Sequence, residues 1–142
     1  MPRSPELYLQ DISDAIEKIE QYTAYSFFSF LANNDMRYDA VLRNLQIIGE
    51  AAKNIPPDLK KRYPLEWPKI IGLRDILSHA YFGIDEKIIW DIVKNKLPEL
   101  KRTIVEMLNE YPQQKETSFF KGKMGNMIML LVHLYFPAIA VV

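Results

Sequence analysis

Several residue types that carry enzyme chemistry are scarce in this chain. It has 142 residues and no cysteine, which excludes disulfides, thiol nucleophiles and zinc sites built on thiolates. Its two histidines are His79 and His133, too few for a multi-histidine metal site within one chain. We therefore expect any catalysis to use neither a metal nor a cofactor.

The chain also has no excess of charge of either sign. Lys and Arg number 18 and Asp and Glu number 18, so the formal net charge is zero. Proteins that coat nucleic acids without selectivity are usually strongly basic. The balance argues against a general nucleic-acid coat, but it leaves room for one local basic cleft.

Glycine is scarce as well, with 5 residues, whereas apolar residues make up 49% of the chain and charged residues 25%. This composition is typical of a folded, helix-permissive chain rather than a disordered one. The length suits one domain. Residues 1–5 begin no apolar run that could act as a secretory signal, so we expect a cytoplasmic protein.

Apolar residues recur at helical spacing along most of the chain, which predicts an all-α fold class. A first helix is expected to start at Ser4 and Pro5, where the hydroxyl can cap the helix and the proline suits the first turn. Further helical segments are expected over 35–54, 58–63, 66–80 and from Asp85 to about Leu108.

Turn and capping residues set the expected ends of these helices. Pro56 and the proline after it end the second helix, and Gly83 is a natural terminator of the helix over 66–80. Asp85 is expected to cap the last helix. Pro98 should kink that helix or restart it near Lys96.

The last thirty residues do not continue the pattern. Residues 113–126 are polar, and residues 127–142 form an apolar run interrupted by His133 and Pro137. As a helix that run would reach about 24 Å, short of the roughly 30 Å hydrocarbon core, so a membrane span is not expected. We expect the run to pack on the body or at an oligomer interface. The chain is therefore divided into a domain over 1–112 and an atypical tail over 113–142.

Residues able to do chemistry gather in one stretch, 72–83, which overlaps the end of the helix predicted over 66–80. Asp75 and His79 are four residues apart and share a helix face, so the Asp75 carboxylate can orient the imidazole. Arg74, Ser78 and Tyr81 cluster together on another side. The buried stripe expected for this helix consists of Ile70, Leu73, Leu77 and Ala80, with Ile76 flanking it.

The same helix geometry separates the two groups best suited to catalysis. Arg74 and His79 are five residues apart, hence about 140° around the helix and roughly 7.5 Å along it, so they do not converge within one straight helix. Two copies related by a two-fold axis could each supply one Arg and one His to a shared cleft. A symmetric dimer is therefore expected, although a lone Arg and His on a surface helix are often only solvated side chains.

Other charged residues allow two interpretations. Lys60, Lys61 and Arg62 form the only tight basic run, which is usually a solvated face but is also a candidate for phosphate contacts. Arg43 and Glu50 lie on the polar side of the second helix, where solvated charges are the ordinary interpretation. Glu50 could instead support the site from the neighbouring helix.

Sequence motifs add a family resemblance. Arg74, Asp75, three further positions, His79, one residue and Tyr81 match the motif of the HEPN superfamily ribonucleases. The stretches LQIIGEAA at 45–52, IIGLR at 70–74 and HAYFGID at 79–85 resemble the HepT branch specifically. The likeness runs in the same order and spacing from about residue 7 to residue 111.

The resemblance implies a HEPN-type bundle of four to five helices that forms a symmetric dimer. It implies a toxin of a toxin–antitoxin module, an endoribonuclease that cuts transfer or messenger RNA without a metal. In that family His79 would handle protons at the ribose 2′-hydroxyl and the leaving oxygen, and Arg74 would hold the scissile phosphate. The expected partner is an MntA-like nucleotidyltransferase antitoxin that transfers AMP to Tyr81.

Two other interpretations remain at the sequence level. The first is a non-catalytic HEPN module that docks a nucleotidyltransferase and presents nucleotide. The second is a structural helical dimer with an accidental motif. Tyr81 could likewise be a packing residue at the edge of the helix.

Overall fold

The computed structural model describes residues 3–24, 35–79 and 83–111. The chain divides into two units, Met1–Tyr111 and Pro112–Val142, and all of the second unit lies outside the described residues. The expectations for the tail over 113–142 therefore stay predictions.

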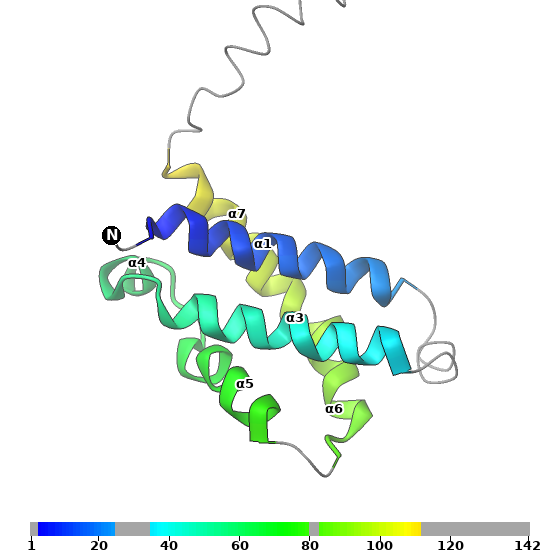
Figure 1. The fold of residues 1–142 in the computed structure, drawn as a ribbon. Helices are drawn as coiled ribbons and strands as arrows, with labels where there is room; N and C mark the ends of the chain where they lie inside the picture. Colours follow the sequence, from blue (N-terminus) through cyan, green and yellow to red (C-terminus); the bar gives the residue numbers. More distant parts are fainter. Residues whose placement is uncertain (1–2, 25–34, 80–82, 112–142) are drawn as a thin grey trace, which may run out of the picture. The chain divides into compact units, whose positions relative to one another are not determined.

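Two long helices form the centre of the first unit. Helix α1 spans Pro5–Tyr22 and α3 spans Asp35–Lys53, and Figure 1 shows them side by side with opposite chain directions. Their facing stripes follow the helical spacing of apolar residues seen in the sequence. The buried residues are Leu9, Ile12, Ala15, Ile16 and Ile19 from α1, and Val41, Leu45, Ile48, Ala51 and Ala52 from α3.

Helix α7, over Leu97–Asn109, packs on α1 from behind in the view of Figure 1. Its buried residues Leu97, Leu100, Ile104 and Met107 recur every three or four positions and complete the core. The short helix α4, over Pro57–Arg62, precedes α5, over Trp67–His79. Helix α5 packs on α3 and carries Arg74, Asp75 and His79.

The segment before α7 departs from regular α-helix, as its proline predicts. Helix α6 covers Glu86–Asp91, and a π-helical turn, η1, covers Ile92–Lys96 before α7 begins at Leu97. Pro98 has no backbone N–H, and its ring would clash with the carbonyl four residues earlier, so the preceding turn widens. The predicted restart near Lys96 is confirmed.

The helix caps follow the sequence in one case and not in another. Asp85 accepts a hydrogen bond from the Lys87 backbone N–H at 2.9 Å, which confirms it as the cap of α6. Ser4 is the residue before α1, but its hydroxyl makes no capping bond. Its backbone carbonyl accepts from Leu7 N–H at 3.1 Å instead, so the predicted side-chain cap is wrong.

Helix α5 is less buried than its apolar stripe predicted. Leu77 is buried, but Leu73 and Ile70 are only half-buried, and Ile76 is 62% exposed. The backbone of α5 lies against Gly49 of α3 at Ile70 and Arg74. Ala80 lies outside the described residues.

The described residues form an all-α bundle without strands, which confirms the predicted fold class. In residues 3–24, 35–79 and 83–111, no helix has the length and apolarity needed to cross a membrane. Gly83 follows α5 with φ of 90°, a left-handed conformation that favours glycine and suits its predicted place at the turn between α5 and α6.

Candidate functional site

The site begins with the closest contact between α3 and α5. A Cβ atom added to Gly49 would lie 2.8 Å from the Arg74 backbone nitrogen and 3.1 Å from the Ile70 carbonyl oxygen. Both distances are shorter than ordinary contacts to a Cβ atom, and both involve backbone that cannot rotate away. Glycine at this position therefore lets α3 approach the backbone of α5 at Arg74.

This close approach brings a carboxylate of α3 to the guanidinium of Arg74. Glu50 Oε2 lies 3.4 Å from Arg74 Nε, and Asp75 Oδ1 lies 3.1 Å from Arg74 Nη1. The Arg74 side chain remains 51% exposed. Ion pairs this exposed add little stability, but two acceptors on different nitrogens restrict where the guanidinium can point. The sequence leaves open whether Glu50 supports the site, and its contact with Arg74 favours that role.

The imidazole of His79 is held by the backbone of its own helix. Its Nδ1 lies 2.7 Å from the carbonyl oxygen of Asp75. A carbonyl can only accept, so Nδ1 carries the proton and donates it to this bond, which leaves Nε2 as the unprotonated nitrogen of the neutral ring. Nε2 has no hydrogen-bond partner among the described residues, and the His79 residue is exposed.

The orientation of His79 differs from the one predicted from the sequence. The Asp75 carboxylate was expected to contact the imidazole, but it contacts Arg74 instead, while the Asp75 carbonyl holds the ring. Ser78 makes the same kind of bond one position earlier, since its Oγ donates to the Arg74 carbonyl at 2.6 Å. One residue, Asp75, therefore touches both candidate catalytic side chains.

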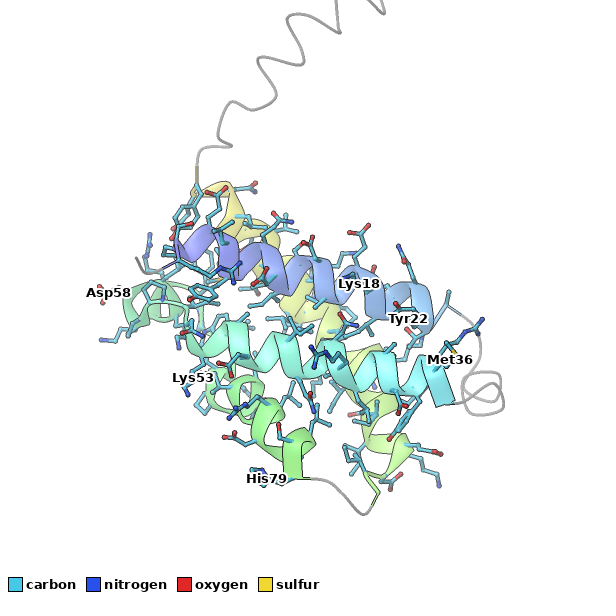
Figure 2. All side chains as sticks on the ribbon, in the orientation of Figure 1. Lys18, Tyr22, Met36, Lys53, Asp58 and His79 are labelled. Atoms are coloured by element: carbon cyan, nitrogen blue, oxygen red, sulfur yellow. The ribbon has the colours of Figure 1, made fainter. Side chains whose placement is uncertain are left out.

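Within one chain these two side chains remain apart. No hydrogen bond or ion pair joins Arg74 to His79 in the described part of the chain, and both side chains are exposed. In Figure 2, His79 stands at the free end of α5. Tyr81, the expected site of modification, lies outside the described residues.

The basic run over 60–62 lies at the other end of α5. It belongs to α4, whereas Arg74 and His79 lie in the second half of a 13-residue helix that begins at Trp67; such a helix is roughly 20 Å long. Arg62 pairs with Glu110 at 3.0 Å. Partial burial lowers the pKa of Lys60, and Lys61 is exposed. Their role in phosphate contact stays a prediction, with Arg62 already engaged by a carboxylate.

Glu110 also fixes the residue after that run. The hydroxyl of Tyr63 donates to Glu110 Oε1 at 2.7 Å, and this hydrogen bond to the carboxylate raises the pKa of Tyr63. Together with the Arg62 pair, it ties α4 to the end of α7. At least part of the basic run therefore has a structural role.

A groove that the sequence did not predict lies along α5. It has a volume of about 830 Å³ and runs between α5 and the η1–α7 segment. Its wall is mostly apolar, with the ion pair between Lys69 and Glu66, 2.9 Å long, among its lining residues. Gly72 also lines it, and a Cβ atom added there would meet nothing within 4 Å. The apolar lining residues include Leu65, Leu73, Ile76, Ile92, Leu97 and Leu100.

The described residues hold no group of three or more His, Cys, Asp or Glu side chains arranged to bind a metal ion. The chemistry that the site offers comes from Arg74, whose guanidinium can bind an oxyanion, and from His79, whose imidazole can donate or accept a proton.

These features define a class, an all-α protein with an exposed arginine and histidine on one helix. Residues 12–107 match the family model described as Ribonuclease HepT-like. The chain belongs to this family of HepT-like ribonucleases, which confirms the resemblance drawn from its motifs. The predicted enzyme class, a ribonuclease, is that of the family.

Individual relatives agree with the family. A probable ribonuclease HepT of Thermococcus cleftensis is 47% identical over 103 residues, which cover 71% of this chain and 93% of the relative. Two Methanocaldococcus jannaschii proteins named as RNases are 38% and 37% identical, covering 78% and 72% of this chain and 93% and 94% of their own lengths. No solved structure matches the chain with significance.

The α3–α5 contact gives a prediction with a matched control. Gly49→Ala should lower the free energy of unfolding by about 1–3 kcal/mol, because the new methyl group overpacks against backbone. Gly72→Ala, in open space on a helix, should raise it by about 0.5–1 kcal/mol. Urea denaturation at one protein concentration measures both. Equal effects of the two substitutions would contradict the close contact at Gly49.

Proposed function

We propose that this chain is the cytoplasmic toxin of a toxin–antitoxin module, an endoribonuclease that cleaves RNA without a metal at a composite site formed by Arg74 and His79 across a dimer. The family and the ribonuclease names of the relatives support the reaction class. The observation that carries the assignment is the state of the two side chains, since Arg74 is oriented by carboxylates and His79 presents an unbonded Nε2.

The proposed reaction is attack by the ribose 2′-hydroxyl on the neighbouring phosphorus. His79 Nε2 takes the proton of the 2′-hydroxyl as the new P–O2′ bond forms. The bond from phosphorus to O5′ breaks, and O5′ takes a proton from a protonated imidazole. Arg74 binds the non-bridging oxygens and stabilises the charge that develops on them. The products are a 2′,3′-cyclic phosphate and a 5′-hydroxyl, and the reaction requires RNA because DNA lacks the 2′-hydroxyl.

A two-fold axis beside α5 brings the two groups together. In an antiparallel pair of α5 helices, two residues lie opposite each other when their residue numbers add up to one fixed total. Arg74 of one copy lies level with His79 of the other when the pair is centred between Ile76 and Leu77. That geometry yields two equivalent Arg–His pairs in one dimer.

The side of α5 that carries Ile76 offers apolar surface that a second copy could bury. Ile76 is the apolar side chain beside the centre and is 62% exposed. Gly72 lies one turn earlier on the same side, and a Cβ atom added there would have open space around it. The apolar groove along α5 continues from Ile76 and offers further surface to bury.

Neutralisation of the toxin is the remaining part of the proposal. A cognate MntA-like nucleotidyltransferase transfers AMP to the hydroxyl of Tyr81, two residues after His79. The added phosphate is an anion that competes with RNA phosphate for Arg74. This step is supported by the motif that places a tyrosine at this position and by the family to which the chain belongs.

The catalytic assignment predicts a loss of activity with either substitution. His79→Ala should reduce the rate of RNA cleavage about 10²–10⁴-fold, since it removes the proton carrier. Arg74→Ala should reduce it about 10²–10³-fold. Arg102→Ala is the control, because Arg102 is exposed on α7 and has no partner among the described residues. A gel assay of a labelled RNA measures the rates, and equal rates for all four proteins would contradict the assignment.

Mixing the two inactive variants then tests the composite site. If Arg and His come from different copies, a heterodimer of Arg74→Ala and His79→Ala retains one intact pair of the two. Random exchange makes half of the dimers mixed, so activity should return to about a quarter of wild type. A site contained within one chain gives no recovery.

The dimer itself gives a third prediction. Ile76→Asp places a charge at the centre of the proposed interface, so it should convert the dimer to monomer and abolish cleavage while α5 stays folded. Ile88→Asp is the control, because Ile88 is also exposed, at 57%, but lies on α6. Light scattering after size-exclusion chromatography gives the masses. A dimeric Ile76→Asp variant would place the interface elsewhere.

The modification gives a fourth prediction. Co-expression with the cognate nucleotidyltransferase should add the mass of AMP to the peptide that contains Tyr81, and the modified protein should lose RNA cleavage. Tyr81→Phe removes the acceptor hydroxyl, so this variant should remain active in the presence of the partner. Mass spectrometry of the peptide measures the modification. If Tyr81 stays unmodified after co-expression with an active nucleotidyltransferase, the proposal is rejected.

A further inference from the structure

Arg43 is a cation that the site as described does not use. It lies on α3 and is exposed, and it makes no hydrogen bond or ion pair with the described residues. Most other arginines of the chain have partners: Arg3 pairs with Asp11, and Arg62 and Arg74 are held by carboxylates. Arg102, on α7, shares the unpaired state of Arg43.

The position of Arg43 on α3 relates it to the Arg74 cluster. Glu50, which contacts Arg74, follows Arg43 by seven residues, so the two lie within about 20° on the helix surface and roughly 10.5 Å apart along it. Gln46 lies between them on the same stripe and is half-buried. The stripe therefore carries a free guanidinium two turns away from the carboxylate that holds Arg74.

The direction of α5 places Arg43 toward the His79 end of the site. Figure 1 shows α3 and α5 running in opposite directions, and the contact at Gly49 aligns the end of α3 with the middle of α5. Moving along α5 from Arg74 toward His79 therefore corresponds to moving along α3 from Glu50 back toward Arg43. Along α3, Arg43 therefore lies on the side of Glu50 that corresponds to the His79 end of α5.

The local charge explains why a second cation is needed there. Glu50 and Asp75 both lie within 3.4 Å of the Arg74 guanidinium, so this cluster of three has a formal charge of −1. An RNA backbone carries one negative charge per nucleotide and would be repelled by such a cluster acting alone. Because Arg43 has no carboxylate partner among the described residues, its full charge is available to the strand.

We propose that Arg43 binds a backbone phosphate of the RNA substrate, about three nucleotides from the phosphate held by Arg74. The spacing follows from the roughly 10.5 Å along α3 and about 3.4 Å per stacked nucleotide. This inference rests on the proposed ribonuclease function. It assigns Arg43 to substrate binding and not to the chemical step.

The experiment measures binding separately from cleavage. A 2′-O-methyl RNA lacks the attacking hydroxyl, so its dissociation constant can be measured with the full chain over a series of salt concentrations. Arg43→Gln should raise the dissociation constant three- to tenfold at low salt. It should also reduce the slope of log Kd against log salt by about 0.7, the value for one phosphate contact to a single strand. Arg43→Lys should keep the slope, and Arg102→Gln should match wild type in both quantities.

Cleavage of unmodified RNA by the same proteins separates the two proposals. Arg43→Gln should raise KM by the same factor and leave kcat within about twofold of wild type. Equal binding and equal salt slopes for Arg43→Gln and Arg102→Gln would overturn the role of Arg43, as would a fall in kcat with no change in the slope. If wild type binds the 2′-O-methyl RNA with the predicted slopes but cleaves nothing, the nuclease assignment fails while the Arg43 contact stands.

Discussion

The contact between α3 and α5 at Gly49 positions the candidate site. Without a side chain at Gly49, the backbone of α3 approaches Arg74 closely enough for Glu50 to contact its guanidinium. A larger residue would separate the helices and move Arg74 away from its partner. Gly49 has no functional side chain, but it sets the relative positions of Glu50 and Arg74, which do.

The electrostatics of the site follow from this contact. Arg74 is oriented by two carboxylates, which restricts its direction but also offsets its charge. His79 is held by a carbonyl, which selects the tautomer whose Nε2 can accept a proton. A single copy therefore offers two prepared groups that face different directions. Within one copy Arg74 and His79 do not meet, which is the reason for the dimer proposed at Ile76. The Arg74 cluster also lacks a net positive charge, which is the reason for the phosphate contact proposed at Arg43.

Most of the fold could be predicted from the sequence because it depends on local patterns. The helical spacing of apolar residues in α1, α3 and α7 matches their buried faces. Asp85 caps α6 as predicted, and the break predicted at Pro98 appears as a π-helical turn. The prediction was wrong for two side chains. The Ser4 hydroxyl does not cap α1, and the Asp75 carboxylate contacts Arg74 and not His79.

By itself the sequence determined the helices, the motif residues Arg74 and His79 and the family, because spacing and residue type along the chain are enough for each. Only the tertiary structure decided which side of α5 meets α3, that Glu50 is the partner of Arg74, and that Ile76 and the groove beside it stay open. Periodicity fixes which residues share a face of a helix. The neighbour that each face meets depends on residues distant in the chain, here on the missing side chain of Gly49.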